Sequence, residues 1–127
     1  LGWEESWLQV EQLKDAVGPG NILSIEVESE ALTEVFTGFG QRGASAEAVG
    51  DRTVRQVREY LKANVPVWDH LADQLLVPMS MSGRGSFRTG TLSRHAETNI
   101  GVIQRFLSLD LSAARSDDGG TTVRIGA

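Results

Sequence analysis

The two histidines are the side chains best suited to nucleophilic or acid–base chemistry, because the chain contains no cysteine. His95 follows Ser93 and Arg94, where a helix over residues 93–106 is predicted to begin. A helix N-terminus favours a phosphate and disfavours imidazolium, which would keep a ring nitrogen of His95 available as a nucleophile. Asn99 lies one turn along the same face and could orient the ring or a phosphate oxygen. Spacing alone also allows His95 to be an ordinary solvent-exposed residue.

His70 lies at the start of a second predicted helix, over residues 67–76. Asp73 and Gln74 follow at i+3 and i+4, so either could share a site with His70. The spacing fits no standard metal-binding motif, and we assign no metal ligands. The alternative interpretation is ordinary helix capping and surface polarity.

Two glycine-rich segments, residues 38–43 and 83–85, could cradle a phosphate. The first has the letters of a dinucleotide-binding motif but lacks an acidic residue about twenty positions further on, at the end of a second strand. A tight turn from strand to helix is therefore favoured. Four arginines in or beside these loops could form an anion patch or a solvated surface: Arg42, Arg84, Arg88 and Arg94.

Elements of both types must position these residues. Alternation predicts strands over residues 7–13 and 22–28, paired or adjacent, and helical spacing predicts a helix from Ser45. The apolar run 77–81 is predicted to be extended and buried, and further strands are predicted at 87–89, 107–111 and 121–125. The predicted fold is α+β, a mixed β-sheet packed against helices, with residues 1–127 forming a single domain or lobe.

Composition narrows the function classes. The chain is 40% hydrophobic and 23% charged, which is typical of a globular protein. Its net charge of −5 counts against strong sequence-independent binding to nucleic acid. No run is long enough to cross a bilayer, so we expect no membrane partner. The absence of cysteine is compatible with a cytoplasmic location.

Three stretches in register resemble the C-terminal part of the RNA 3′-terminal phosphate cyclase family. They are residues 38–47 (GFGQRGASAE), 70–78 (HLADQLLVP) and 93–100 (SRHAETNI), the last followed by 105–107 (RFL). The resemblance implies a ββαβα-like unit of the cyclase fold. It also implies an enzyme that uses ATP and Mg²⁺ (or Mn²⁺) to convert an RNA 3′-phosphate to a 2′,3′-cyclic phosphate.

The resemblance also implies a role for individual residues. His95 matches the histidine that carries AMP, and Asp73 and Gln74 match a nucleotide-binding pair. His70 takes the position of the aromatic residue that packs on adenine. Phe39 or Phe36 is expected to supply another wall of that pocket, and Asn99 completes the predicted nucleotide-binding set.

Family members are much longer, and this chain resembles roughly their last third. The resemblance therefore implies a fragment with little or no cyclase activity unless the missing N-terminal part is supplied. The alternative is a non-catalytic, cyclase-like scaffold protein of RNA processing or ribosome assembly. Such relatives lack the nucleophilic histidine, so His95 favours the enzyme. An unrelated phosphate- or protein-binding module is a third interpretation.

Overall fold

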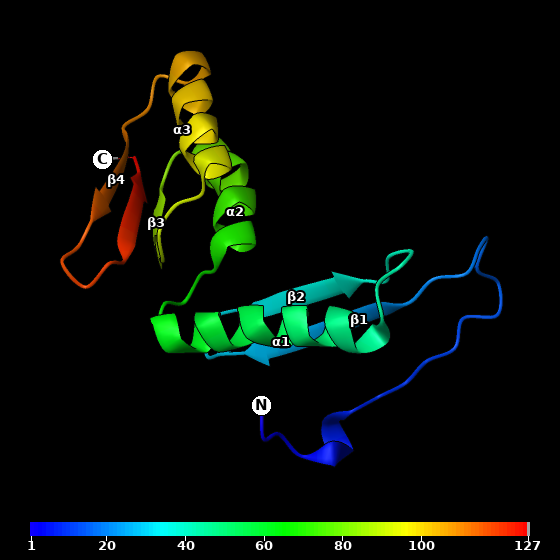
Figure 1. The fold of residues 1–127 in the computed structure, drawn as a ribbon. Helices are drawn as coiled ribbons and strands as arrows, with labels where there is room; N and C mark the ends of the chain where they lie inside the picture. Colours follow the sequence, from blue (N-terminus) through cyan, green and yellow to red (C-terminus); the bar gives the residue numbers. More distant parts are fainter. Residues whose placement is uncertain (127) are drawn as a thin grey trace. The chain divides into compact units, whose positions relative to one another are not determined.

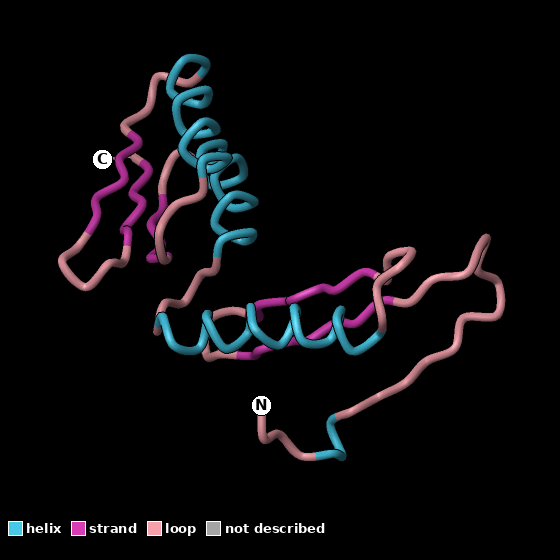
Figure 2. The backbone as a smooth tube through the Cα atoms, viewed as in Figure 1, coloured by secondary structure: helices cyan, strands magenta, loops and turns pink. Residues whose placement is uncertain are grey.

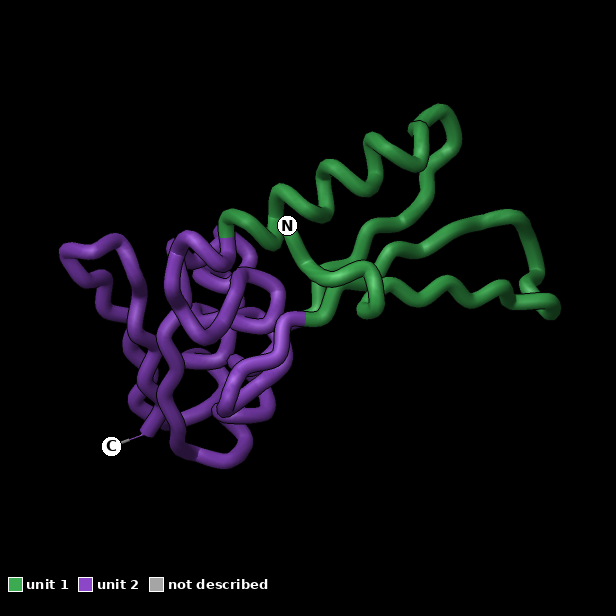
Figure 3. Tube along the Cα trace, turned by 90° about the horizontal axis from the view of Figure 1, so that it is seen from below, with its two compact units in different colours: residues 1–26, 35–59 green, residues 27–34, 60–127 purple. Residues whose placement is uncertain are grey.

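A computed structural model describes residues 1–126. The chain forms two compact units, which are distinguished by colour in Figure 3. Unit 1 contains Leu1–Glu26 and Val35–Glu59, and unit 2 contains Val27–Glu34 and the chain from Tyr60 onward. The described residues form three α-helices and two small sheets, which confirms the α+β class (Figure 1). None of the helices in residues 1–126 is both long and apolar enough to cross a membrane.

Strands β1 (Ile22–Glu28) and β2 (Thr33–Phe39) form a hairpin. The prediction for residues 22–28 is confirmed, whereas the strand over 7–13 is wrong. Residues 5–7 form a short 3-10 helix, η1 (Glu5–Trp7), and the apolar side chains of Leu8, Val10 and Leu13 are exposed. Alternation produces a half-buried strand only where one face finds a core, and here it finds none.

Helix α1 (Ala46–Ala63) begins as predicted. The Ser45 hydroxyl accepts a hydrogen bond from the backbone N–H of Ala48 at 3.2 Å, which satisfies one of the free donors of the first turn. Its buried residues recur at helical spacing: Val49, Thr53, Val57 and Tyr60.

Unit 2 places helices α2 (Asp69–Ser82) and α3 (Arg94–Phe106) against a three-stranded sheet, as Figure 2 shows. Strands β3 (Gly85–Thr89), β4 (Leu111–Arg115) and β5 (Thr121–Ile125) lie in the order β3–β5–β4, and both pairs are antiparallel. An isolated parallel bridge joins Val67 to Thr89. The core between the layers consists of Val67, Ala72, Leu76, Phe87, Ala96, Ile103, Leu111, Val123 and Ile125.

Two predicted segments of unit 2 differ from the structure. Residues 77–81 are helical, because α2 continues through Pro78 to Ser82. Proline removes one N–H from a helix, but the buried Leu76 and Ser80 on either side hold the turn in place. The strand predicted over 107–111 begins only at Leu111, and Phe106 at the end of α3 is 83% exposed.

Candidate functional site

Asp73 links the two helices of unit 2 at the predicted site. Its Oδ2 lies 3.3 Å from Nε2 of His95, and its Oδ1 accepts a hydrogen bond from Nδ2 of Asn99 at 3.2 Å. One carboxylate on α2 therefore engages two residues of α3 that are four positions apart. The same-face relation predicted for His95 and Asn99 is confirmed by this shared partner.

The first turn of α3 is held by its cap. The hydroxyl of Ser93 accepts a hydrogen bond from the N–H of Ala96 at 3.1 Å, and the carbonyl of Ser93 accepts one from the N–H of Glu97 at 3.0 Å. His95 lies in this turn, as predicted. The free N–H groups and the positive end of the helix dipole lie in the same turn, where they favour an anionic ligand.

The exposure of the two partners differs in a way that suits chemistry on an external substrate. The His95 side chain is 81% exposed, whereas that of Asp73 is 24% exposed. Asp73 is thus partly held among its neighbours while the imidazole faces solvent. A carboxylate oxygen 3.3 Å from one ring nitrogen can orient the imidazole and leave the other ring nitrogen toward solvent, which is the arrangement of an oriented nucleophile or base.

His70 and Gln74 are both exposed on α2. Asp73 was expected to be able to share a site with His70, but its carboxylate contacts His95 and Asn99 of α3. His70 lies near another carboxylate instead, that of Glu34, whose pKa its charge helps to lower. The roles of His70 and Gln74 in nucleotide binding stay predictions.

Glu34 was not singled out from the sequence, although it is only 3% exposed. It accepts a hydrogen bond from the backbone N–H of Trp68, the N-cap residue of α2. Burial raises the pKa of Glu34 above its ordinary value, against the opposing effects of the Trp68 N–H and the His70 charge. Alternation with the buried Phe36 places Glu34 on an inward face, and this signal could have identified it.

A second titratable group lies close to Glu34. Tyr60 is buried, and its hydroxyl donates a hydrogen bond to the carbonyl of Pro66 at 3.3 Å. Burial raises the pKa of Tyr60, and the Glu34 charge raises it further. The Trp68 ring meets that of Tyr60 edge to face, with centroids 5.8 Å apart. The start of α2 is therefore packed by aromatic rings as well as capped by a carboxylate.

The phenylalanines proposed for the adenine pocket belong to unit 1. Phe36 is buried, whereas Phe39 at the end of β2 is 61% exposed. Exposure favours Phe39 over Phe36 as a ligand-packing ring, and this role stays a prediction. The glycines nearby have a packing reason, since a Cβ atom on Gly38 would collide with the Thr53 side chain.

The arginines do not all remain available for an anion. Arg88 forms an ion pair with Asp118 and donates a hydrogen bond to the carbonyl of Asn64 at 3.4 Å, so it fastens the β4–β5 turn to β3. Arg84 and Arg94 of unit 2 are exposed. Across residues 1–126, no three His, Cys, Asp or Glu side chains gather as they would to hold a metal ion.

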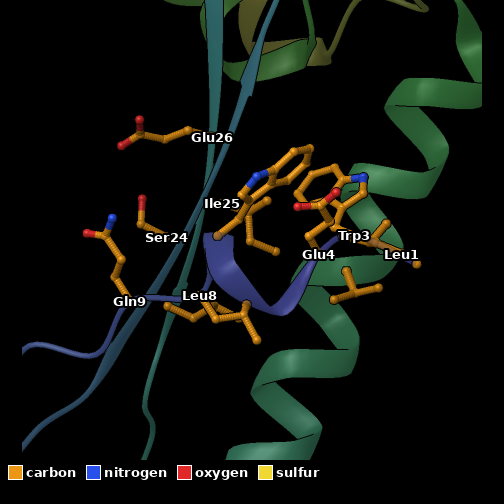
Figure 4. Close-up of a pocket in the computed structure, with 12 residues that line it drawn as sticks. Leu1, Trp3, Glu4, Leu8, Gln9, Ser24, Ile25 and Glu26 are labelled. Carbon is orange, nitrogen blue, oxygen red and sulfur yellow. The ribbon is translucent and has the colours of Figure 1, made fainter.

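Unit 1 contains a hollow of about 590 Å³ beside η1. Trp3, Trp7 and Leu8 line it together with Ile25 of β1 and Val54 of α1 (Figure 4). The Trp3 and Trp7 rings contact each other, with centroids 6.2 Å apart. None of the histidines contributes to this hollow.

Several known proteins similar to this chain belong to one family. Residues 2–62 match the sequence model of the RNA 3′-terminal phosphate cyclase insert domain. An RNA 3′-terminal phosphate cyclase of Salmonella typhimurium is 43% identical over 107 residues, which cover 84% of this chain and 32% of that protein. One from Ectopseudomonas mendocina is 41% identical over 118 residues, 93% of this chain and 35% of that protein. One from Pseudomonas aeruginosa is 39% identical over 125 residues, 98% and 37% respectively.

The similarity extends over both compact units, well beyond the insert-domain match. The chain spans about a third of the length of these relatives. This agreement confirms the resemblance drawn from the sequence. The chain belongs to the RNA 3′-terminal phosphate cyclase family.

Proposed function

We propose that this chain contributes the nucleotidyl-transfer site of an ATP-dependent RNA 3′-terminal phosphate cyclase, an RNA-processing ligase. The observation that carries the proposal is the contact of Asp73 with both His95 and Asn99. The exposed imidazole is fixed by a carboxylate at a helix N-terminus, where the phosphates of a nucleotide are favoured.

His95 acts as the nucleophile in the first step. A ring nitrogen bonds to the α-phosphorus of ATP while the bond to the bridging oxygen breaks, and pyrophosphate leaves with the electron pair. Asp73 holds the ring and balances the positive charge that develops on it. Asn99 keeps the carboxylate of Asp73 in place, because its side-chain amide donates to the other oxygen.

Two further steps complete the reaction. An oxygen of the RNA 3′-phosphate bonds to the phosphorus of the His95 adduct, the N–P bond breaks, and the imidazole is restored. The RNA 2′-hydroxyl oxygen then bonds to the 3′-phosphorus, AMP leaves, and the hydroxyl proton passes to solvent. His70 and Gln74 are proposed to pack on or hydrogen-bond to the adenosine.

The proposed cofactors are ATP and Mg²⁺ or Mn²⁺, and the proposed partner is RNA that ends in a 3′-phosphate. Because residues 1–126 gather no acidic cluster for a metal, the steps above use the chain's own side chains. We propose that the part of the relatives outside this chain supplies the remaining contacts, and that the location is cytoplasmic. The chain alone should therefore transfer AMP slowly and cyclise little RNA.

The test is intact-mass analysis after long incubation with ATP and magnesium. The wild-type chain is expected to gain one AMP, and the His95→Asn variant none. Glu97→Gln, an exposed change in the same turn, is the matched control and should gain AMP as the wild type does. Equal AMP uptake by the wild type and His95→Asn would refute the proposal. No uptake by either would favour a non-catalytic scaffold role for this chain.

A further inference from the structure

The end of the β1–β2 hairpin belongs to unit 2, although the rest of the hairpin belongs to unit 1. Its turn is closed by the Ser29 hydroxyl, which donates to the Leu32 carbonyl at 2.7 Å, while the Ser29 N–H donates to the same carbonyl at 2.9 Å. Leu32 packs against the core of unit 2. A fixed turn therefore presents Glu34 to the start of α2.

Burying the Glu34 carboxylate beside the start of α2 costs free energy. A carboxylate that is 3% exposed loses most of its hydration, and burial is the largest influence on its raised pKa. Its compensation is specific, since it accepts the N–H of Trp68 and faces the charge of His70. Costly buried polar groups with one specific partner are typical of positions that fix geometry.

The turn that Glu34 caps carries the candidate nucleotide residues. Trp68 is the N-cap of α2, and His70, Asp73 and Gln74 follow within two turns. The side chain of Trp68 accepts no donor of this helix, so no side-chain cap comes from the N-cap residue itself. The Glu34 carboxylate accepts the N–H of the N-cap residue of α2, whereas in α3 the N-cap residue Ser93 accepts the N–H of Ala96, three positions further on.

We propose that Glu34 is a positioning residue of the nucleotide site, acting through Trp68 on the turn of α2 that carries His70, Asp73 and Gln74. Glu34 lies inside residues 2–62, the stretch that matches the insert domain, whereas Trp68 lies outside it. The insert stretch thus takes part in building the site. This inference rests on the proposed function for its nucleotide, but its geometry can be tested without one.

The test uses nuclear magnetic resonance of the isotope-labelled chain and two reporters. Exchange of the Trp68 backbone amide reports the hydrogen bond to Glu34. The side-chain amide signal of Asn99 reports the position of Asp73, to which it donates. Asp73→Ala marks where the Asn99 signal lies when this acceptor is lost, and the backbone amide of the buried Val123 verifies that unit 2 is folded.

Glu34→Ala should speed Trp68 exchange about tenfold, as loss of one hydrogen bond to a charged acceptor would, and move the Asn99 signal toward its Asp73→Ala position. Glu34→Gln keeps an acceptor at the same reach and should restore the wild-type Asn99 signal. Glu30→Ala, an exposed change in the same hairpin, should change neither reporter. An Asn99 signal that stays at its wild-type position in folded Glu34→Ala would overturn the proposal.

Loss of the Val123 signal in Glu34→Ala would mean that unit 2 has unfolded, and a milder variant is then used. Glu34→Asp keeps the charge but withdraws the acceptor by one methylene, so the Asn99 signal should move in the same direction by a smaller step. An unmoved signal would again overturn the proposal. Neither reporter involves ATP. Failure of the chain to take up AMP would therefore count against the proposed function and leave this test unaffected.

Discussion

Replacing Asp73 with Asn removes the negative charge beside His95 and changes little else. The amide oxygen of Asn can still accept the hydrogen bond from Asn99, and the side chain keeps its size. The His95 imidazole loses its anionic partner at 3.3 Å. Asp73→Asn therefore separates the charge of the carboxylate from its packing.

The expected effects on stability and on rate differ in size. An ion pair in which the His95 side chain is 81% exposed contributes little to folding, so the free energy of unfolding should fall by less than about 1 kcal/mol. In a buried Ser–His–Asp triad the same change costs about 10⁴ in rate. At this exposed site, solvent also stabilises the positive charge that develops on the His95 ring, so the loss of Asp73 should cost less. We expect AMP transfer to slow about 10- to 100-fold, which is about 1.4–2.8 kcal/mol in activation free energy.

The assay follows the fraction of chain that carries AMP against time by intact mass, with unfolding of the same samples measured in urea. Asp110→Asn, an exposed change outside both helices, is the control for the loss of one negative charge. Transfer at the wild-type rate in Asp73→Asn, under conditions in which His95→Asn takes up no AMP, would refute the assigned role of Asp73.

Three further predictions concern folding and pH. Ser93→Ala removes the N-cap of α3 and should lower the free energy of unfolding by about 1 kcal/mol, measured in urea; an unchanged midpoint would contradict the capping role. Leu76→Ala empties a site that is 0% exposed and should cost about 2–5 kcal/mol, seen as a lower midpoint of thermal unfolding by circular dichroism. Because the pKa of Glu34 is raised in the folded state, protonation of its carboxyl favours folding. This contribution is fully present below the ordinary pKa of 4.5 and is lost as pH rises through the raised pKa. The stability of Glu34→Gln relative to the wild type should therefore rise as pH is raised above 4.5, and a difference that is constant with pH would contradict this account.

Local signals in the sequence predict most of the helices. Ser45 and Ser93 each precede a periodic apolar pattern, and both cap a helix in the structure. The extended interpretation of residues 77–81 failed because proline usually ends a helix, while burial of Leu76 and Ser80 keeps this one intact. Tertiary burial outweighs the lost hydrogen bond in that turn.

The candidate site is predicted only in part. Helical spacing places His95 and Asn99 on one face, and the family resemblance adds Asp73 and Gln74. The contact of Asp73 with α3 depends on how the two helices pack, which spacing within one helix cannot reveal. Glu34 lies 34 residues before Trp68, and a partnership at that separation follows from the fold alone.

The most direct test of the central claim is to locate the AMP on the chain after reaction with ATP. Peptide mapping of the wild-type adduct should place AMP on the peptide that contains His95, through an N–P bond that acid breaks. AMP on His70, on a lysine or on a serine, or an adduct that survives acid, would contradict His95 as the nucleophile.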